Sequence, residues 1–264
     1  MFFEVFWGVF LPFFGTALGA LCVLFMRSGM NERTQKCLNG FAGGVMVAAS
    51  VWSLLIPAID QSATYGALAF LPATVGFLGG ILFLLLLDIL SPREQDEQAI
   101  IAVMESDLPI ARKRSMLFLS ITLHNIPEGV AVGIAYASLV AGSVDISAYE
   151  ALALSLGIAI QNFPEGAIVS MPMASCGSSR SRALGYGIVS GIVEPVFALI
   201  TILLSELLLP VFPYLLAFAS GAMIFVVVEE LIPEMSEKES DSHLGTLMFA
   251  LGFCVMMSLD VALG

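Results

Sequence analysis

Long apolar runs separated by short polar breaks recur along the whole chain. A helix needs about 20 mainly apolar residues to cross the hydrocarbon core of a membrane. Marking the runs and breaks on this basis predicts eight membrane-spanning helices, at residues 5–26, 38–58, 66–90, 114–138, 148–171, 183–207, 212–232 and 244–263. The pattern therefore predicts an all-α integral membrane protein, with one transmembrane domain over residues 1–264 and a variable loop at about 91–113.

The basic residues test this division, because Lys and Arg concentrate in cytoplasmic loops. All 10 fall in the odd-numbered loops, and the even-numbered loops hold none. They are Arg27, Arg33, Lys36, Arg93, Arg112, Lys113, Arg114, Arg180, Arg182 and Lys238. A wrong number of spans would scatter them over both sides of the membrane. We therefore expect a multi-pass protein of the plasma (inner) membrane, with cytoplasmic odd loops and both termini extracytoplasmic.

Composition agrees with this class of protein. Hydrophobic residues make up 58% of the chain and charged residues 12%, whereas soluble domains are about 25% charged. The four cysteines lie far apart without a CxxC pair, which is not the pattern of a zinc ribbon or a disulfide framework. The net charge of −12 favours a cation as partner, provided that carboxylates lie where one can bind. We expect no nucleic-acid partner and no organic cofactor.

Three carboxylates interrupt the apolar runs near their middles. Glu128, Glu165 and Glu194 lie about 11 to 18 residues into their predicted helices, which places them near the membrane midplane. A charged group at the centre of a spanning helix costs about 2.5–3.5 kcal/mol on insertion scales. Polar residues can serve simply to hold helices together. Glutamates do this poorly, because an unpaired buried carboxylate is costly, and no Lys or Arg lies in the apolar interior of any span.

A six-residue pattern occurs in both the fourth and the fifth predicted helix. HNIPEG at 124–129 and QNFPEG at 161–166 share four residues and lie 37 residues apart. The two helices cross the membrane in opposite directions, so the matched motifs suggest a two-fold axis in the membrane plane, as in many transporters. Each proline removes a backbone donor and frees a carbonyl one turn earlier. The prolines could also serve simply to kink the helices.

The polar positions of each motif share one helical face, because residues i, i+1 and i+4 are neighbours there. Imidazole suits zinc and other late first-row metals, while carboxylate and amide oxygens also accept harder cations. The cluster therefore favours a divalent cation that is bound and released. Its six side chains are His124, Asn125, Glu128, Gln161, Asn162 and Glu165.

The two motifs, in successive helices, resemble those of the ZIP (Zrt/Irt-like) family of divalent metal transporters, and Gln161 resembles the bacterial GufA-like branch. The resemblance covers nearly the whole chain. It implies a 3+2+3 bundle, in which the fourth and fifth helices lie between two inverted three-helix repeats. It also implies transport of zinc, or of cadmium, iron, manganese or cobalt, toward the cytoplasm.

The resemblance further implies a binuclear site near the midplane. The first metal would use His124, Glu128, Gln161 and Glu165, with Met46 of the second helix as a soft neighbour. The second metal would use Asn125, Asn162 and Glu194, and would share Glu128 and Glu165 as bridges. Without the resemblance, Met46 would be ordinary apolar packing.

The seventh predicted helix ends in FVVVEELIPE, which places Glu229 and Glu230 toward the cytoplasm. They resemble an exit site at which family members carry a His–Glu pair. Glu229 departs from that pattern, which puts strong zinc affinity there in doubt. The alternative is an interfacial pair that reaches water. The loop 91–113 holds no His-rich tract, so zinc sensing by this loop is unsupported.

Two other classes of function remain open from the sequence. An intramembrane metal-dependent hydrolase would need an open metal position for activated water, and the chain has two histidines and no HExxH helix. A non-transporting receptor or scaffold would tolerate loss of the midplane carboxylates. We expect a transporter and no enzyme. The apolar outer faces contact lipid and permit a homodimer, although no interface motif identifies one.

Overall fold

The computed structural model describes residues 2–25, 32–90, 110–141, 147–175, 177–236 and 243–263. Nearly all of these residues are helical, and the described ranges contain no strand. Most of the loop predicted at 91–113 lies outside them, as does the side chain of His124.

Eight long helical segments carry the described chain, in the predicted order and close to the predicted positions. They are α1 (Phe2–Phe25), α2 (Glu32–Ala49) continued by η1 (Ser50–Leu55) and α3 (Ile56–Asp60), α4 (Phe70–Leu90), α6 (Ile110–Ala141), α7 (Ala148–Ser175), α8 (Arg180–Leu203), α10 (Phe212–Val226) continued by η4 (Val227–Leu231) and α11 (Ile232–Ser236), and α12 (Leu244–Leu263). Short turns, η2 (Ala63–Leu68), α9 (Ser205–Leu208) and η3 (Leu209–Val211), lie between them.

The lengths and hydropathy of these segments confirm a helical membrane protein. Seven stretches in the described chain are long and apolar enough to span a bilayer. The eighth predicted span is α6, whose described apolar stretch is Asn125–Val140. Four helices begin earlier than predicted, at Phe2, Glu32, Ile110 and Arg180, because hydropathy marks where a chain enters the hydrocarbon and not where helical hydrogen bonding begins.

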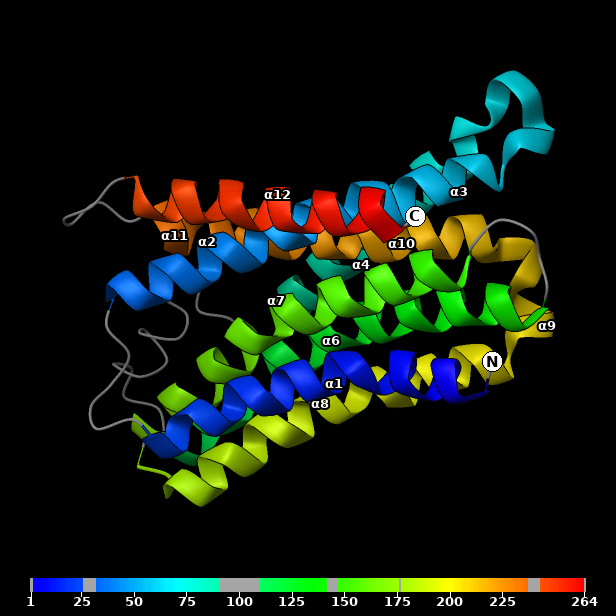
Figure 1. Cartoon of the computed structure of the whole chain (residues 1–264). Coiled ribbons are helices and arrows are strands. Elements are labelled where there is room, and N and C mark those ends of the chain that lie inside the picture. The colour runs from blue at the N-terminus through cyan, green and yellow to red at the C-terminus, as the bar shows by residue number, and fades with distance from the viewer. Residues whose placement is uncertain are drawn as a thin grey trace.

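Four described basic residues lie at one end of the molecule, opposite the two termini. The beginning of α1 and the end of α12 lie at the same end, together with α3 and α9 (Figure 1). Arg33 and Lys36 in α2, and Arg180 and Arg182 in α8, lie in the first turns of helices that start at the opposite end. The placement of these four described basic residues at one end agrees with the prediction that the odd-numbered loops lie on one side of the membrane.

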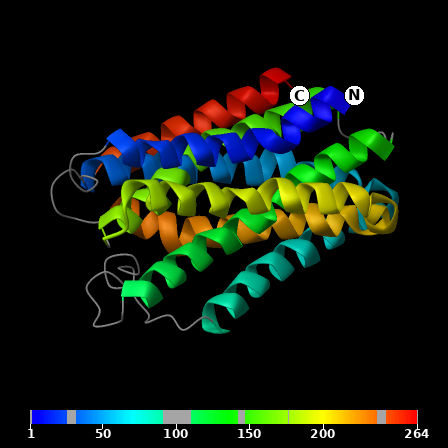
Figure 2. The same cartoon turned by 90° about the horizontal axis from the view of Figure 1, so that it is seen from below.

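The helices form two bundles of four, which run along one common axis (Figures 1 and 2). In the first bundle, α1 packs on α7 and α8, and α6 packs on α8 and α7. In the second bundle, α2 packs on α12, and α10 packs on α4 and α2. The seam between the bundles is made mainly by α2 against α7 and by α10 against α6.

The packing also follows the inverted repeat. Each major contact has a counterpart when α1 is exchanged with α8, α2 with α10, α4 with α12, and α6 with α7. Contact α1–α7 then corresponds to α8–α6, contact α2–α12 to α10–α4, and contact α2–α7 to α10–α6. The repeated motifs of α6 and α7 therefore belong to a two-fold relation that covers the helices of both bundles.

Individual glycines repeat this relation in detail. A Cβ atom added at Gly44 would lie 2.0 Å from the backbone oxygen of Phe249, and one added at Gly221 would lie 2.0 Å from that of Phe77. Gly44 and Gly221 occupy equivalent places in the segments FAGGVM and FASGAM, a second internal repeat that the sequence analysis missed. Both glycines let two backbones touch, so the same helix contact is built twice.

The second and seventh spans share one more irregularity. Each changes from α-helix to π-helix near one end, in η1 and η4, and each π segment is followed by an Ile-Pro pair, at Pro57 and Pro233. Proline has no N–H to donate to the preceding turn, and π turns often mark functional sites in helices. In the seventh span, this widened turn carries Glu229 and Glu230.

Candidate metal centre

The repeated motifs bring their polar side chains together in the middle of the first bundle. α6 and α7 pack against each other, and each motif lies near the centre of its helix. Asn125 and Glu128 on α6, and Gln161 and Asn162 on α7, are all 1% exposed or less. Both helices run through Pro127 and Pro164 without interruption, so the prolines do not end either helix.

A hydrogen bond ties the two motifs to each other. The Gln161 side-chain amide donates from Nε2 to Oε1 of Glu128, at 2.5 Å. The interaction joins position one of the second motif to position five of the first. Two acceptors of this pair, Gln161 Oε1 and Glu128 Oε2, remain without a partner.

α8 brings a third carboxylate to the same place. Oε1 of Glu194 accepts hydrogen bonds from Asn125 Nδ2 at 3.0 Å and from Thr16 Oγ1 at 2.8 Å. Asn125 Nδ2 also donates to the backbone oxygen of Ser190, at 3.2 Å. These contacts join α1, α6 and α8 around the Glu194 side chain, which is 1% exposed.

Thr16 was missed by the sequence analysis, which treated α1 as an ordinary apolar span. The packing explains its place. The Cβ position at Gly166 meets the backbone of Thr16, and the one at Gly129 meets the backbone of Glu194. Thr16 is therefore the two-fold counterpart of Glu194, and the two side chains meet where α1 contacts α8. The signal in the sequence was a hydroxyl placed mid-span, which is too common to be recognised alone.

The cluster holds most of the polar atoms that the described structure leaves without a partner. Of 11 such buried side-chain atoms, six belong to this cluster. They are Asn125 Oδ1, Glu128 Oε2, Gln161 Oε1, both side-chain atoms of Asn162, and Glu194 Oε2. Five of the six are oxygens. Buried polar groups are almost always hydrogen-bonded, so a concentration of unpaired oxygens on facing helices is what a cation would satisfy.

The carboxylates also interact electrostatically with one another. Glu128 is close enough to Glu165 and Glu194 to be affected by their charge. No Lys or Arg occurs in the middle of any span, and like charges near each other in a medium of low dielectric constant repel strongly. The arrangement therefore favours protons or a multivalent cation between the three groups.

Glu165 connects the cluster to the seventh span. It is partly exposed, unlike Glu128 and Glu194, and it interacts electrostatically with Glu230 on η4. Of the two predicted exit-site residues, Glu230 is the one that interacts with the cluster in this way, whereas Glu229 is exposed. Farther along, Asn39 Nδ2 of α2 donates to the carboxylate of Glu234 on α11. A line of carboxylates thus leads from the midplane to the end that carries the basic residues.

Of the two remaining predicted ligands, the structure describes the side chain of Met46 but not that of His124. Met46 is 2% exposed on α2, the helix that faces α7 across the seam. His124 lies in α6, but its side chain is outside the described residues. Met223 on α10, also fully buried, is the counterpart of Met46 in FAGGVM and FASGAM and was not singled out from the sequence.

Among the described side chains, which do not include that of His124, no three of His, Cys, Asp and Glu converge as a ligand group. The orphan oxygens of Asn125, Gln161 and Asn162 are in place to contribute to a metal site here. A set of amides and carboxylates of this kind binds cations less tightly than a closed thiolate site, which suits binding followed by release.

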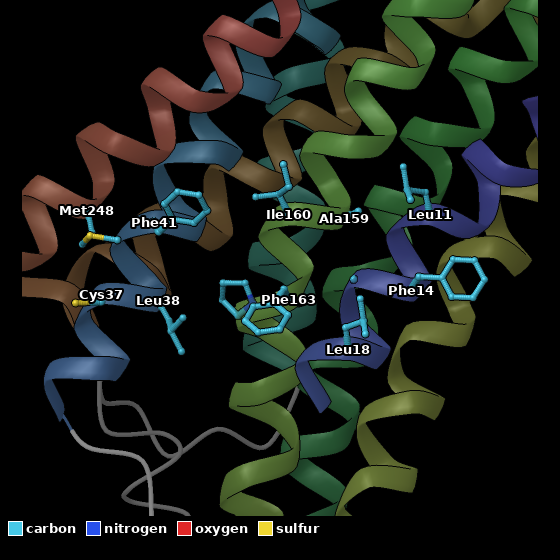
Figure 3. Close-up of a pocket in the computed structure, with 12 residues that line it drawn as sticks. Leu11, Phe14, Leu18, Cys37, Leu38, Phe41, Ala159, Ile160, Phe163 and Met248 are labelled. Carbon is cyan, nitrogen blue, oxygen red and sulfur yellow. The ribbon is translucent and has the colours of Figure 1, made fainter. Parts of the chain in front are cut away.

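A large cavity is separate from this cluster. It has a volume of about 530 Å³ and lies between α1, α2, α7 and α12 (Figure 3). Apolar side chains line it almost throughout, and none of the cluster's polar residues does. The cavity is therefore not the place where a metal would bind.

Comparison with known proteins gives a consistent result. A family model described as "ZIP Zinc transporter" matches residues 91–260. The human protein "Zinc transporter ZIP11" is 35% identical, over 99% of this chain and 98% of its own. "Zinc transporter ZIPB" of Bordetella bronchiseptica is 37% identical, over 96% and 79% respectively. "Zinc transporter GufA" of Myxococcus xanthus is 35% identical, over 94% of both chains.

These matches confirm the resemblance that the paired motifs predicted, including the GufA-like relation. They extend over the helices that hold the polar cluster and over both halves of the inverted repeat. The eight-helix membrane architecture, the repeated motif and the relatives lead to one identification: the chain belongs to the ZIP family of zinc transporters.

Proposed function

We propose that this protein carries zinc across the membrane toward the cytoplasm, through a binuclear site formed by the repeated motifs. The observation that carries the proposal is the group of unpaired, buried oxygens on α6, α7 and α8. The names of the relatives support zinc as the substrate. Cadmium, iron, manganese and cobalt use similar ligands and remain within the chemistry of the site.

The proposed ligands divide into two groups around shared carboxylates. The first metal would be held by His124 and Gln161 with Met46 nearby, and the second by Asn125, Asn162 and Glu194. Glu128 and Glu165 would bridge the two metals. The electrostatic interaction of Glu128 with both other glutamates supports this assignment, because a bridging carboxylate must lie between the two ligand groups.

The two bundles suggest how the site is exposed to each side in turn. All of the proposed polar midplane ligands belong to α6, α7 and α8, in one bundle, and hydrogen bonds join these helices to each other and to α1. The other bundle contributes Met46 and Glu230 across the seam. We infer that the first bundle moves along the second as a unit and carries bound metal with it, which is an alternating-access cycle rather than an open channel.

The line of carboxylates and the charges of the loops support an inward direction of transport. Glu165, Glu230 and Glu234 lead to the end at which Arg33, Lys36 and Arg180 lie. Basic residues mark the cytoplasmic side. The termini would then be extracytoplasmic, in a plasma (inner) membrane. Acidic side chains along the route would offer successive weak sites to a departing cation.

The proposal is tested by zinc uptake into proteoliposomes, together with the metal content of the purified protein. Glu128→Ala should abolish uptake and lower the number of bound zinc ions, because it removes the bridging group. Glu206→Ala is the matched control, since Glu206 is exposed on the short helix α9. Normal uptake by Glu128→Ala would reject the site. Retained zinc without uptake in the wild-type protein would favour a receptor.

The hydrolase alternative has no support from the comparisons, in which the reported relatives are named as transporters.

A further inference from the structure

The large cavity between α1, α2, α7 and α12 has the form of a groove with apolar walls (Figure 3). Leu11 and Leu18 of α1 form one wall, Leu38 and Phe41 of α2 form the other, and Phe163 of α7 lies between them. Its volume of about 530 Å³ is within the range of about 300–1,000 Å³ that is typical of small-molecule sites.

The groove lies on the seam between the two bundles. α1 and α7 belong to the bundle with the polar cluster, and α2 and α12 belong to the other. Ala159, Ile160 and Pro164 line the groove from the same turns of α7 that carry Gln161 and Asn162 on another face. A molecule in the groove would therefore touch both bundles directly behind the metal site.

Basic residues lie at the inner end of this groove. Arg33 is exposed, and it precedes the lining residue Cys37 by four positions, so the two share one face of α2. Arg180 is exposed beside the inner end of α1, where its Nη1 donates to the backbone oxygen of Leu24 at 3.2 Å. An apolar groove that leads toward cationic side chains has the complementarity of a phospholipid with an anionic headgroup.

We propose that this groove binds one anionic phospholipid, with an acyl chain between the two bundles and its headgroup phosphate at Arg33. The α1 wall from Leu11 to Leu18 is about 10 Å long at 1.5 Å per residue, which fits part of an extended chain. A peptide segment is unfavourable there, because an apolar groove in a membrane leaves backbone N–H and C=O groups unsatisfied. The inference concerns lipid recognition and does not depend on which metal is carried.

A lipid in this position would influence transport through the seam. If the first bundle slides along the second, the walls of the groove move relative to each other, and the bound chain must rearrange or leave. Occupancy would then favour the arrangement in which the groove has its present shape. Zinc flux is expected to change with the fraction of anionic lipid in the vesicle, while the metal ligands remain unchanged.

The test is native mass spectrometry of the purified full chain with dioleoylphosphatidylglycerol or dioleoylphosphatidylcholine. One phosphatidylglycerol per chain is expected to bind, and more tightly than phosphatidylcholine. Arg33→Gln should weaken phosphatidylglycerol binding about fivefold, because each basic residue near a membrane surface contributes about 1 kcal/mol. Arg182→Gln, at an exposed residue of the same end, should leave the affinity unchanged.

A groove-filling variant separates this site from general lipid contact. Leu18→Trp should remove the bound lipid, because the added rings enter the groove. Leu199→Trp, at an exposed leucine of α8 that does not line the groove, is the matched control and should retain it. Retention of phosphatidylglycerol by Leu18→Trp, equal affinity for the two lipids, or occupation of the groove by a second copy of the chain would each overturn the proposal.

A measurement on the unaltered protein does not depend on the folding of a variant. Cys37 lines the groove and is half-buried, whereas Cys254 is exposed on α12 outside it. Added phosphatidylglycerol should slow maleimide modification of Cys37 severalfold and leave Cys254 unaffected, as read by peptide mapping. An unchanged rate at Cys37 would contradict the proposal. None of these lipid measurements requires zinc transport, so their failure is distinct from failure of the metal site.

Discussion

The two bundles are built by the same repeat but differ in the polar groups that they bury. In the bundle of α1, α6, α7 and α8, buried side-chain hydrogen bonds run between helices, from Gln161 to Glu128 and from Thr16 and Asn125 to Glu194. Glycines bring backbones into contact in both bundles, at Gly166 in this one and at Gly44 in the bundle of α2, α4, α10 and α12. In the second bundle, a buried hydrogen bond between helices runs from a hydroxyl, Ser220 Oγ, to the backbone oxygen of Ser50. The first bundle therefore concentrates the buried carboxylate and amide oxygens without partners, and the described part of the second holds fewer of them.

The two-fold relation accounts for this difference. It exchanges α1 with α8 and α6 with α7 inside one bundle, and α2 with α10 and α4 with α12 inside the other. Each bundle is therefore symmetric in itself, and the repeat can place polar residues in one bundle twice without placing them in the other. The difference fits the proposed mechanism, in which the first bundle is a carrier body that keeps its site intact and the second is a frame along which it moves.

The largest expected effect is on the polar bundle. Glu128→Gln keeps the size of the side chain but removes the charge that the proposed metals share. Zinc flux should fall by more than about 100-fold, because loss of even an outer partner of a metal ligand costs about 10–100-fold. Radioactive zinc uptake into proteoliposomes measures this, with Glu206→Gln as the exposed control. A variant with flux near that of the control would remove the distinction between the bundles.

A second prediction concerns movement at the seam. After replacement of Cys22, Cys176 and Cys254 by Ser, a bifunctional thiosulfonate should link Cys37 of α2 to Phe163→Cys of α7, since both positions line one groove. The link joins the two bundles, so flux should fall more than about tenfold and recover on reduction, as expected if bundle motion limits transport.

The matched link stays inside one bundle. Cys37 and Met248→Cys line the same groove from α2 and α12, and their link should leave flux nearly unchanged. Equal inhibition by both links would mean that the groove itself, and not relative movement, is sensitive to modification.

The third prediction concerns stability of the apolar bundle. Gly44→Ala places a Cβ 2.0 Å from the backbone oxygen of Phe249, whereas Gly43→Ala meets side-chain atoms at 3.5 Å, an ordinary contact. Overpacking of this kind costs about 1–3 kcal/mol. Thermal unfolding in detergent should show a clear loss for Gly44→Ala and little change for its neighbour. Equal melting temperatures would show that the frame is less tightly packed than the contacts indicate.

The fourth prediction is a dependence of metal affinity on pH. Binding requires ionised Glu and neutral His, and therefore releases protons. As pH falls below about 6.5, the reference pKa of His, protons compete with zinc and affinity should decrease, by up to about tenfold per pH unit for each proton released. Isothermal titration in two buffers of different ionisation enthalpy measures the zinc affinity and the number of protons released. An affinity that stays constant from pH 5 to 8 would contradict a His–Glu site.

The smallest expected effect is on metal preference. Met46→Leu keeps an apolar side chain of similar volume and removes the soft sulfur. Cadmium transport should decrease a few-fold relative to manganese transport, because thioether ligands favour softer metals. Met256→Leu, at another fully buried methionine, is the control. An unchanged cadmium-to-manganese ratio would make Met46 a packing residue and confine the ligands to the polar bundle.

Sequence alone determined the number and order of the helices, because apolar length and the placement of Lys and Arg follow directly from the thickness and charge asymmetry of a membrane. It also identified the paired motifs and the midplane glutamates, since a carboxylate inside an apolar run is costly in lipid and therefore marks a functional position. The family followed from the same residues.

Tertiary structure decided which of these residues meet. Only the packing of α1 against α8 brings Thr16 to Glu194, and only the tertiary arrangement places Glu230 within electrostatic reach of Glu165 while Glu229 is exposed. It also divided the helices into two bundles and left a groove at their seam. The physical reason is that hydropathy acts on each helix separately, whereas contacts between helices depend on close fit between small residues and backbone, which a single hydropathy profile does not contain.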